Sequence, residues 1–406
     1  MKKKLLNLFA LLFAAALVMT GCKNIDKGGT GGAIDTAQDS STAEQIKKMG
    51  LGINLGNTFE ATGLEQYPPH DMKNTNSWIS GTVDAHETAW GSPKITKQII
   101  QGYKNAGFST LRIPVAWSNL MNMNSYTISP ALLNRVQEIV NWTLETGMYA
   151  VVNLHWDGGW IKHFPEQYDE CMKKYKRIWE QVAARFKDYN DFLLFESQNE
   201  ELGFDSLWNQ WSGTSSQKVK SYEIVNAINQ AFVDTIRASG GNNAYRHLII
   251  AGYNTNIDRT CDPLFKMPDD PAKRMAVKVH YYDPFGFTHL EKDESWAKAS
   301  FKWGTQSEKN YLISEMNKMK RRFIDRGIPV VIGEYGICKQ GVTQEDINEY
   351  TLAVTEAMYS RGMLPMLWDV QLNENKGEEI FYYNRHIPGM TNSALEAGMK
   401  KIAASR

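Results

Sequence analysis

Residues 193–200 read LLFESQNE, an apolar run that becomes polar in its second half. The apolar part is typical of a short buried strand, and a strand covered on both faces by helices is expected to stay apolar to its end. The amide of Asn199 and the carboxylate of Glu200 therefore indicate a strand that ends at an open rim. Residues 329–336, PVVIGEYG, repeat the pattern and place Glu334 at a second strand end. These two strand ends are the first candidates for a shared site.

Around these two stretches, short apolar segments alternate with helical ones along almost the whole chain. Strands are predicted at 50–57, 110–115, 149–155, 193–200, 247–251, 275–281, 329–336 and 363–370, and helices at 95–106, 129–145, 168–187, 217–238, 309–325 and 343–360. About eight strand–helix pairs of this kind form either an open doubly wound sheet or a (β/α)8 barrel.

Polar residues at the strand ends favour the barrel, because the carboxyl ends of all its strands meet at one mouth. These residues are Arg112, His155, Asn199, Glu200, His280, Glu334 and Trp368. An open dinucleotide-binding sheet would carry G-x-G-x-x-G after its first strand, whereas residues 50–56 have a different glycine spacing. We therefore expect an α/β fold, a (β/α)8 TIM barrel that forms one domain over residues 44–406. The long loops at 58–92 and 283–307 are expected to wall its cleft.

The amino-terminal segment has the composition of a targeting signal followed by a tether. Residues 2–4 are lysines, and the apolar stretch at 5–18 is too short to span a bilayer comfortably. Small residues then precede Cys22, as in a bacterial lipobox, although Met19 stands where Leu is more usual. We expect a signal peptide at 1–21, lipidation of Cys22, and a flexible tether over 22–43. The protein would then be exported and held at the outer membrane or cell surface by that anchor alone; an ordinary secretory signal is the alternative.

The bulk composition excludes some classes of partner. The formal net charge is zero, so nothing favours nucleic acid or another strongly charged partner. The chain has 12 Trp, 18 Tyr and 16 Phe, most of which are expected in the core, while some suit a cleft that stacks on sugar rings. Cys171, Cys261 and Cys338 are widely spaced without a Cys-x-x-Cys motif, so a zinc or redox site has no support. They are expected to be buried free thiols, with one disulfide possible.

Two carboxylates on strand ends are the groups that glycoside hydrolysis requires. One carboxylic acid protonates the leaving oxygen, and the other attacks the sugar or activates water; in retaining enzymes the two lie about 5 Å apart. Glu200 and Glu334 are the candidates, because barrel closure brings distant strand ends together. Glu196 is expected one layer deeper as a hydrogen-bonded barrel residue, and Glu201 in the loop. This chemistry needs no metal and no cofactor.

The motifs around these carboxylates resemble glycoside hydrolase family 5. They are Asn199-Glu200, Gly333-Glu334, LRIP containing Arg112, NLHWD containing His155, HYY at 280–282 and Trp368, in the order of the family. The resemblance covers residues 44 to 400, nearly the whole mature chain. GINLGN at 52–57 and ETAWG at 87–91 resemble the subgroup that contains endoglucanases, xyloglucanases and some xylanases.

The resemblance implies a single catalytic domain with Glu200 as acid/base and Glu334 as nucleophile. It also implies that the following residues bind the substrate or tune the carboxylates: Arg112, His155, Asn199, His280, Tyr282 and Trp368. Arg112 and Tyr282 are expected beside Glu334. Asn199 is expected at the 2-hydroxyl of the sugar, and Trp368 under the sugar before the scissile bond. The negative charge of Glu334 is expected to raise the pKa of Glu200.

Trp156 departs from the family pattern, since many relatives carry a second histidine at this place. Together with Trp160, Trp208 and Trp211 it follows the third and fourth strands and is a candidate sugar platform, with core or loop packing as the alternative. Trp90 has a stronger case because it lies in one of the motifs above.

Other classes of function lack their motifs. No G-x-S-x-G is present for a serine hydrolase, and HETAW at 86–90 fails to complete H-E-x-x-H. A non-catalytic surface glycan-binding lipoprotein would need the aromatic residues but not both carboxylates. We therefore predict a monomeric, retaining endo-β-1,4-glucanase that acts on plant cell-wall β-1,4-glucans. A xyloglucanase or xylanase of the same fold is the alternative.

Overall fold

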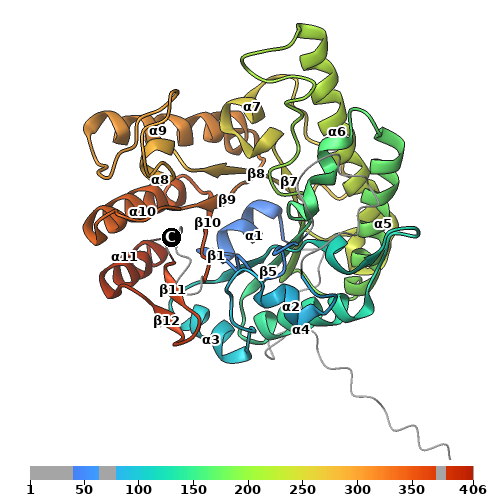
Figure 1. Ribbon diagram of the computed structural model, residues 1–406, viewed down its shortest axis with the longest axis horizontal. Helices are drawn as coiled ribbons and strands as arrows, with labels where there is room; N and C mark the ends of the chain where they lie inside the picture. The colour runs from blue at the N-terminus through green and yellow to red at the C-terminus, as the bar shows by residue number, and fades with distance from the viewer. Residues whose placement is uncertain (1–39, 64–78, 372–380, 406) are drawn as a thin grey trace, which may run out of the picture.

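The computed structural model describes residues 40–63, 79–371 and 381–405. Eight parallel strands close into a barrel in the order β1-β10-β9-β8-β7-β6-β5-β2 (Figure 1), which confirms the predicted (β/α)8 fold. The barrel strands are β1 Gly52–Asn54, β2 Thr110–Ile113, β5 Tyr149–Asn153, β6 Leu193–Glu196, β7 Leu248–Ala251, β8 Met275–Tyr281, β9 Val330–Tyr335 and β10 Leu364–Leu367. Two small hairpins lie outside it, β3 Met121–Asn122 with β4 Thr127–Ile128, and β11 Tyr383–Asn384 with β12 Gly389–Met390.

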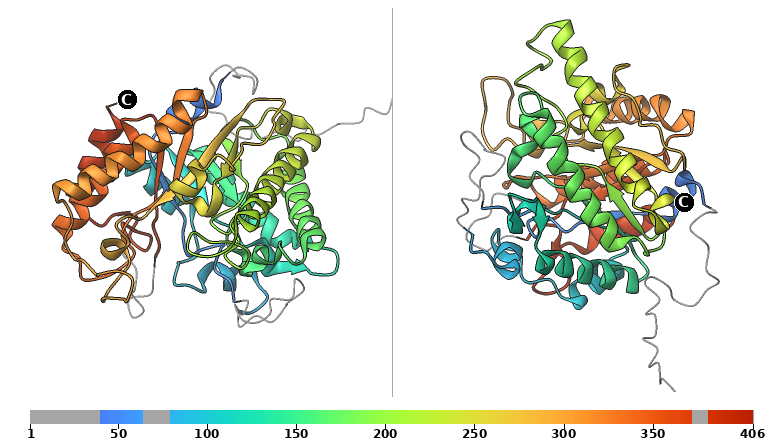
Figure 2. Two further views of the ribbon diagram at one scale, coloured as in Figure 1. Left: turned by 90° about the horizontal axis from the view of Figure 1, so that it is seen from above. Right: turned by 90° about the vertical axis from the view of Figure 1, so that its right-hand side faces the viewer.

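Helices surround the barrel, with α5 and α6 on one side and α9 to α11 on the other (Figure 2). Their bounds are α1 Thr42–Lys48, α2 Val83–Thr88, α3 Lys97–Asn105, α4 Pro130–Glu145, α5 Tyr168–Phe186, α6 Ser215–Ala238, α7 Ile257–Cys261, α8 Phe285–Thr288, α9 Gln306–Arg322, α10 Gln344–Tyr359 and α11 Ser393–Ala403. Helix α4 begins next to the predicted residue 129, because Ser129 caps it and a proline stands in its first turn. Helix α9 begins earlier than predicted, because Thr305 and Glu308 form a capping box that sets its first turn.

Helix α1 closes the amino-terminal end of the barrel. Its Ile46 and the following Met49 pack against side chains inside the barrel, and Gln45 Nε2 donates to the carbonyl oxygen of Asp191, just before β6, at 2.6 Å. We call the buried side chains above α1 the apolar layer; they are Val151, Leu194, Ile249, Ala276, Val331, Leu364 and Met366. This layer fills the lower half of the barrel, as expected for a packed core rather than a pore.

The next layer toward the barrel mouth is ionic. Glu196 lies two residues beyond Leu194, and Lys278 lies two residues beyond Ala276, so each projects to the same inner face one step higher. Arg112 on β2 joins them, and all three side chains are fully buried. We call Arg112, Glu196 and Lys278 the charged layer. Its depth confirms the prediction that Glu196 lies beneath the site.

The two candidate carboxylates are held differently at the mouth. Glu334 lies within β9, which runs to Tyr335. Strand β6 ends at Glu196, and the next residues form a loop in which the Asn199 N–H donates to the carbonyl oxygen of Leu154 at 2.9 Å. The prediction that the strand continues to Glu200 is therefore wrong, because the chain leaves the sheet four residues earlier.

Several predictions fall on segments outside the described residues. They are the signal peptide at 1–21, Cys22, nearly all of the tether, and the part of the first long loop at 64–78. Within the described ranges, no helix has both the length and the apolar character needed to cross a membrane. No disulfide joins Cys171, Cys261 and Cys338, so the possible disulfide among them is not formed; Cys171 is buried as expected, whereas Cys261 and Cys338 are partly exposed.

Candidate active site

A cleft of about 620 Å³ lies at the carboxyl-terminal ends of the strands. It brings together every predicted site residue except Arg112: His155, Asn199, Glu200, His280, Tyr282, Glu334 and Trp368. The loop after β1 contributes Glu60 and Trp90, and the loop after β8 contributes Phe285 and His289. Both predicted loop walls are therefore confirmed for their described parts.

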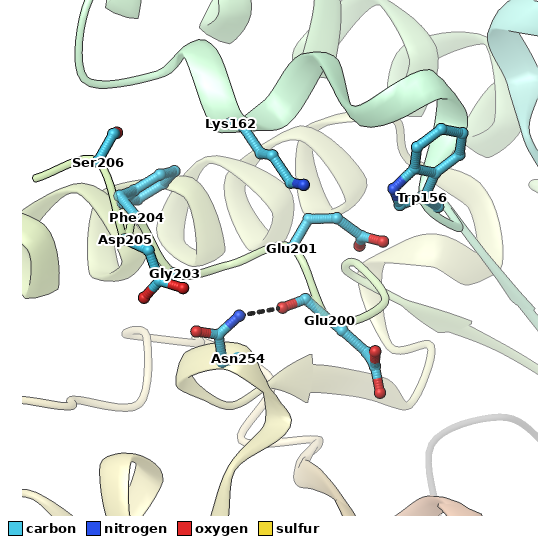
Figure 3. Close-up of a pocket in the computed structure, with 9 residues that line it drawn as sticks. All are labelled: Trp156, Lys162, Glu200, Glu201, Gly203, Phe204, Asp205, Ser206 and Asn254. Atoms are coloured by element: carbon cyan, nitrogen blue, oxygen red, sulfur yellow. Dashed lines mark hydrogen bonds between the residues drawn. The ribbon is translucent and has the colours of Figure 1, made fainter. Parts of the chain in front are cut away.

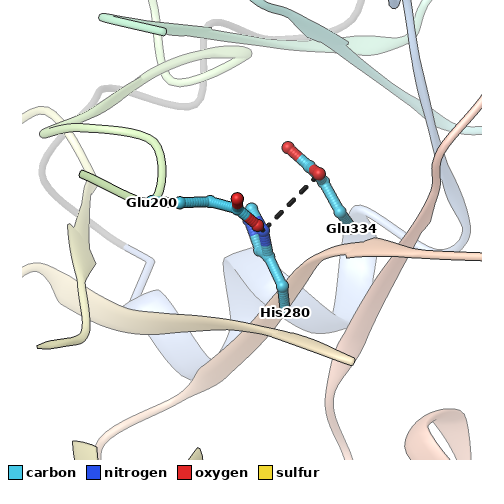
Figure 4. A group of neighbouring side chains, drawn as sticks. All are labelled: Glu200, His280 and Glu334. Atoms are coloured by element: carbon cyan, nitrogen blue, oxygen red, sulfur yellow. Dashed lines mark hydrogen bonds and ion pairs between the residues drawn. The ribbon is translucent and has the colours of Figure 1, made fainter. Parts of the chain in front are cut away.

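Glu200 and Glu334 face each other across His280 (Figure 4). One oxygen of each carboxylate and one ring nitrogen of His280 all lie within 4.8 Å of one another. His280 Nδ1 is 2.7 Å from Glu200 Oε1 and 3.5 Å from Glu334 Oε2. These three residues offer the donor types of a cation site, but existing bonds already use the oxygens of Glu334, as described next. The pair is better arranged to act on a bond placed between the two carboxylates.

Arg112 fixes the position of Glu334 from below. Its Nη1 donates to Glu334 Oε1 at 2.7 Å and to Asn54 Oδ1 at 2.8 Å. Nη2 donates to Glu196 at 2.7 Å and Asn199 Oδ1 at 2.9 Å, and Nε donates to Glu196 at 2.8 Å. All five N–H groups of the guanidinium are thus engaged. Tyr282 takes the other oxygen of Glu334, at 3.0 Å, so the predicted positions of Arg112 and Tyr282 are confirmed.

Lys278 supports the loop that carries the acid. Its Nζ donates to Glu196 Oε1 at 2.6 Å and to the carbonyl oxygens of Gln198 and Asn199 at 2.7 and 3.3 Å. These bonds hold the chain directly before Glu200, where the sheet ladder has ended. Gly333 makes room for the lysine, since a Cβ there would lie 2.6 Å from Lys278 Cδ.

The charges of this layer are matched when Glu334, which lies above it, is counted. Burial alone would raise the pKa of Glu196, but Arg112 and Lys278 outweigh it and hold that pKa well below its usual value. Burial lowers the pKa of Lys278, while the carboxylate of Glu196 opposes that change. Arg112 and Lys278 thus supply two positive charges beside the two carboxylates of Glu196 and Glu334.

The pKa of Glu200 is raised, as an acid requires, but for a different reason from the one predicted. The cause is desolvation in the cleft, and Lys278, Arg112 and His289 oppose it. The negative charge of Glu334 is not the main cause, because Arg112 pairs with it directly. Burial also lowers the pKa of His280 to about 3, so its ring is neutral and serves as a hydrogen-bond partner of Glu200.

The remaining predicted residues line the cleft around the carboxylates. Asn199 uses its amide oxygen on Arg112, which leaves its NH₂ group to donate to a bound molecule. His155 and Trp368 stack with ring centroids 5.8 Å apart and planes 10° apart. Burial and the nearby Arg112 keep the pKa of His155 well below its usual value, so it is neutral. Trp368 thus presents a flat aromatic face held in place by a second ring.

A second pocket of about 400 Å³ continues the cleft beyond Glu200 (Figure 3). Trp156, Glu201 and Asn254 line both pockets, and Lys162 reaches into the second one (Figure 3). Glu201 was expected in the loop, and it lies there, but its carboxylate is buried and accepts a bond from Gln198 Nε2 at 2.9 Å. Burial raises the pKa of Glu201 to about 7.

The loop after β5 turns Trp156 into this cleft through an unusual backbone path. Trp156 and Asp157 have φ values of 42° and 52°, and the next two residues are left-handed glycines. Non-glycine residues in this region are strained and need support. Asp157 provides it, because its carboxylate accepts from Ser118 N–H and Oγ, both at 2.6 Å, and from Trp160 Nε1 at 2.7 Å.

The tryptophans predicted as sugar platforms separate into two groups. Trp156 and Trp90 line the cleft. Trp160 is buried, and Trp208 packs against the rings of Tyr222 and Tyr253. Trp211 is 82% exposed and lines neither pocket.

Sequence reasoning missed four residues of the site. Lys278 and Asn54 lie inside strands, where only their polarity in an apolar run signals a role. Glu60 lies in the loop after β1 and accepts bonds from the N–H groups of Asn57 and Thr58, and burial raises its pKa to about 7. His289 has no local signal, because its place in the cleft depends on how the loop after β8 folds.

Comparisons with known proteins agree with this geometry. Residues 71–374 match the model of the family described as cellulase, glycosyl hydrolase family 5. An endoglucanase A of Paenibacillus barcinonensis is 35% identical over 369 residues, which cover 84% of this chain and 86% of that protein. A xyloglucan-specific endo-β-1,4-glucanase of Bacteroides ovatus is 33% identical, over 83% of this chain and 66% of that one. Among solved structures, a lichenase from Caldicellulosiruptor sp. F32 superposes with a TM-score of 0.80 at 32% identity, covering 90% of this chain and 96% of that chain.

Proposed function

Since this chain belongs to the cellulase family, glycosyl hydrolase family 5, and is an endo-β-1,4-glucanase, we propose that it cleaves internal β-1,4 bonds by double displacement with retention of anomeric configuration. The observation that carries the proposal is the separation of the carboxylates. Oxygens of Glu200 and Glu334 lie within 4.8 Å, a spacing close to the roughly 5 Å of retaining enzymes and too short for the intervening water of inverting ones.

In the first step, Glu334 attacks the anomeric carbon while the bond from that carbon to the glycosidic oxygen breaks. Glu200 gives its proton to that oxygen, and the leaving chain departs. Arg112 and Tyr282 hold one oxygen each of Glu334 before the attack, so little reorganisation is needed. In the second step, water attacks the glycosyl-enzyme and gives a proton to Glu200, which restores both carboxyl groups.

The site also supplies contacts that favour the transition state. The NH₂ group of Asn199 is free to donate to the 2-hydroxyl oxygen, an interaction that strengthens as positive charge develops on the sugar. Trp368 forms the floor under the sugar whose bond is broken, with His155 stacked against it. His280 holds the acid in reach of the leaving oxygen.

Two variants test the assignment of roles. Glu334→Gln and Glu200→Gln should each lower kcat on a soluble β-1,4-glucan by about 10⁴-fold, whereas Glu166→Gln, at an exposed carboxylate, should not. On an aryl β-cellobioside with a good leaving group, Glu200→Gln should retain more activity in the glycosylation step, because that leaving group needs no protonation. Near-full activity of either variant on the glucan contradicts the assignment.

Retention is tested separately by proton NMR. The first product formed from a cello-oligosaccharide should be the β-anomer, before mutarotation mixes the two forms. An initial α-anomer would show inversion and refute the double displacement while leaving the family assignment untouched.

The preferred glucan is part of the proposal. The relatives include an endoglucanase, a xyloglucan-specific enzyme and a lichenase, and the cleft continues into a second pocket beyond Glu200. We propose unbranched and mixed-linkage β-glucans as the main substrates, with xyloglucan as the second candidate on the strength of the Bacteroides ovatus relative. Initial rates on cellulose, mixed-linkage glucan, xyloglucan and xylan decide between them.

For location, we propose that the protein is a monomer exported and anchored by lipid at Cys22, on the strength of the lipobox-like residues before it. Treating producing cells with an inhibitor of lipoprotein signal peptidase should make the unprocessed precursor accumulate. Normal processing in its presence would show an ordinary secretory signal.

A further inference from the structure

Trp296 is a large aromatic side chain left in water beside the catalytic cleft. It is 67% exposed and lies in the loop after β8, which forms one wall of the cleft. Its ring centroid is 5.6 Å from that of Phe285. Phe285 lines the cleft and is itself 42% exposed. These two rings form an open apolar surface that continues the cleft wall outward.

The same surface connects inward to the nucleophile. The ring of Phe285 stacks on His289 with centroids 4.3 Å apart and planes 2° apart. His289 meets Tyr282 edge to face at 4.9 Å, and Tyr282 donates to Glu334. An uninterrupted series of rings therefore leads from the reacting centre to Trp296.

The loop that carries this surface is held firmly by a lysine. Lys339 Nζ donates to the carbonyl oxygens of Gly286, Leu290 and Ser300 at 3.0, 2.8 and 2.6 Å. The same ammonium lies 4.0 Å from the ring centroid of Phe301. One side chain thus ties the start, middle and end of the loop together.

A second set of bonds closes the tip on which Trp296 stands. Asp293 accepts from Lys298 Nζ at 2.7 Å and from the Ala299 N–H at 3.0 Å, and the Glu294 N–H donates to the Ala297 carbonyl at 2.9 Å. The exposed indole is therefore presented by an ordered turn, and binding to it requires little further ordering of the loop.

The order of the barrel strands shows which part of a glucan chain this surface faces. Trp368, under the sugar that is attacked, follows β10, whereas the loop with Trp296 follows β8, on the other side of β9 and its Glu334. His289 of the same loop lines the cleft together with Glu200, the acid that protonates the leaving oxygen. The surface thus lies on the side of the leaving group.

We propose that Phe285 and Trp296 form a binding site for the leaving part of the β-1,4-glucan chain, beyond the sugar unit next to the cleaved bond. The inference rests on the proposed function and adds to it a reason for preferring long chains. The apolar C–H faces of glucosyl rings stack on aromatic faces, and two presented rings bind successive units.

The test compares substrates that do and do not reach Trp296. Cellohexaose has sugar units on the leaving side, whereas an aryl β-cellobioside has only its aryl group there. For Trp296→Ala, the ratio of kcat/KM on cellohexaose to kcat/KM on the aryl β-cellobioside should fall by about fivefold, mainly through KM. Trp296→Phe should recover part of the loss. Trp211→Ala is the control, since Trp211 is also exposed, at 82% against 67% for Trp296, but lies in the loop after β6 and not in the loop that carries Phe285.

The possible results separate this inference from the proposed function. An unchanged ratio in Trp296→Ala, or an equal fall in Trp211→Ala, overturns the binding site. So does a loss on both substrates in parallel, which would indicate a folding defect, or a change in oligomeric state without a kinetic change, which would indicate a protein contact. Wild-type protein that fails to cleave any β-1,4-glucan would instead refute the proposed function.

Discussion

The barrel interior contains two layers of inward-facing side chains that differ in their chemistry, one apolar and one charged. The apolar layer rests on helix α1 and is made of aliphatic side chains. The charged layer, two residues further along the strands, holds Arg112, Glu196 and Lys278 without any exposure to water. Buried ions of this kind seldom improve stability over apolar residues of similar shape. The charged layer is therefore best explained by what it positions.

What it positions is the pair of carboxyl groups of Glu200 and Glu334. Two cations, Arg112 and Lys278, face two anions, Glu196 and Glu334. The charges of these four side chains balance. A negative charge on Glu200 would therefore have no cation of its own to pair with. Together with desolvation in the cleft, this balance favours the protonated form of Glu200, which the proposed role of proton donor requires. The lower layer sets the fold, and the upper layer sets the chemistry.

The largest expected effect comes from breaking the charged layer. Arg112→Met leaves Glu196 and Glu334 without their main partner and should lower the free energy of unfolding by about 3–5 kcal/mol, with loss of activity. Urea unfolding measures the stability change. Arg112→Lys keeps the charge but not the five-bond geometry, and should be intermediate. A loss below about 1 kcal/mol would mean that the layer behaves as a surface ion pair.

Breaking the apolar layer should separate stability from activity. Leu194→Ala removes a fully buried side chain and should cost about 3 kcal/mol of unfolding free energy. The kcat of the folded enzyme should stay within about twofold of wild type, because the charged layer intervenes between this cavity and the cleft. Ile313→Ala, at an exposed position on α9, is the control for stability. A large fall in kcat for Leu194→Ala would show that the two layers are coupled.

Removing Lys278 from the charged layer should shift the pH profile of kcat. Lys278→Met removes both the support of the Gln198–Asn199 carbonyls and a cation that lowers the pKa of Glu200. We expect kcat to fall by about 10²-fold. The descending limb of the pH profile should move to higher pH, because the pKa of Glu200 rises when this cation is removed. Arg112 and His289 remain to face Glu200, with the neutral His280 and the carboxyl groups of Glu201 and Glu334 beside it.

The matched control for that variant is Lys174→Met, at another buried lysine, whose pKa burial lowers to about 8 and whose ammonium lies over the ring of Trp160 instead of beside the Gln198–Asn199 carbonyls. It should lose stability without moving the descending limb. If the descending limb of the pH profile is at the same pH in Lys278→Met and in the wild type, Lys278 supports the Gln198–Asn199 loop without affecting the pKa of Glu200.

The smallest effect concerns a buried carboxyl group that neither layer neutralises. Burial raises the pKa of Glu201 from 4.5 to about 7. Between these values the folded protein keeps a proton that the unfolded chain has lost, so the free energy of unfolding falls as pH rises through this window. Glu201→Gln should reduce that fall by on the order of 1 kcal/mol. Denaturant unfolding at pH 5 and pH 7 measures it, and Glu166→Gln should leave the fall unchanged.

The sequence predicts the fold well because the signals are local and repeated. Strand and helix periodicity, caps and polar strand ends all recur along the chain, and they are sufficient for the barrel and for Arg112 and Glu334 near its mouth. The contacts of Arg112 and Tyr282 with Glu334 were expected from the family resemblance. It predicts less where a role depends on contacts between distant segments. Lys278 is a single lysine in an apolar strand, and its role appears only when the closed barrel brings its side chain to Glu196 of β6, with β7 between the two strands. Likewise, the cause of the raised pKa of Glu200 depends on burial, which no motif states.

The exposed aromatic residues show the same limit. Trp211 and Trp296 are both tryptophans in long loops of polar sequence. Only the folded loops reveal that Trp296 packs beside Phe285 of the cleft wall, whereas Trp211 is exposed in the loop after β6.

The position of helix α1 decides which end of the barrel faces a support to which the amino terminus is attached. Thr42 begins this helix beneath the barrel floor, where its Oγ1 is 2.9 Å from Nδ1 of His247 at the start of β7. Glu200 and Glu334 lie at the opposite end of the same strands. A support joined through the chain before residue 40 therefore holds the barrel by its base and leaves the mouth facing outward. Enzyme captured on beads through an amino-terminal linker would keep its cleft accessible to an insoluble polymer without any change to the catalytic domain.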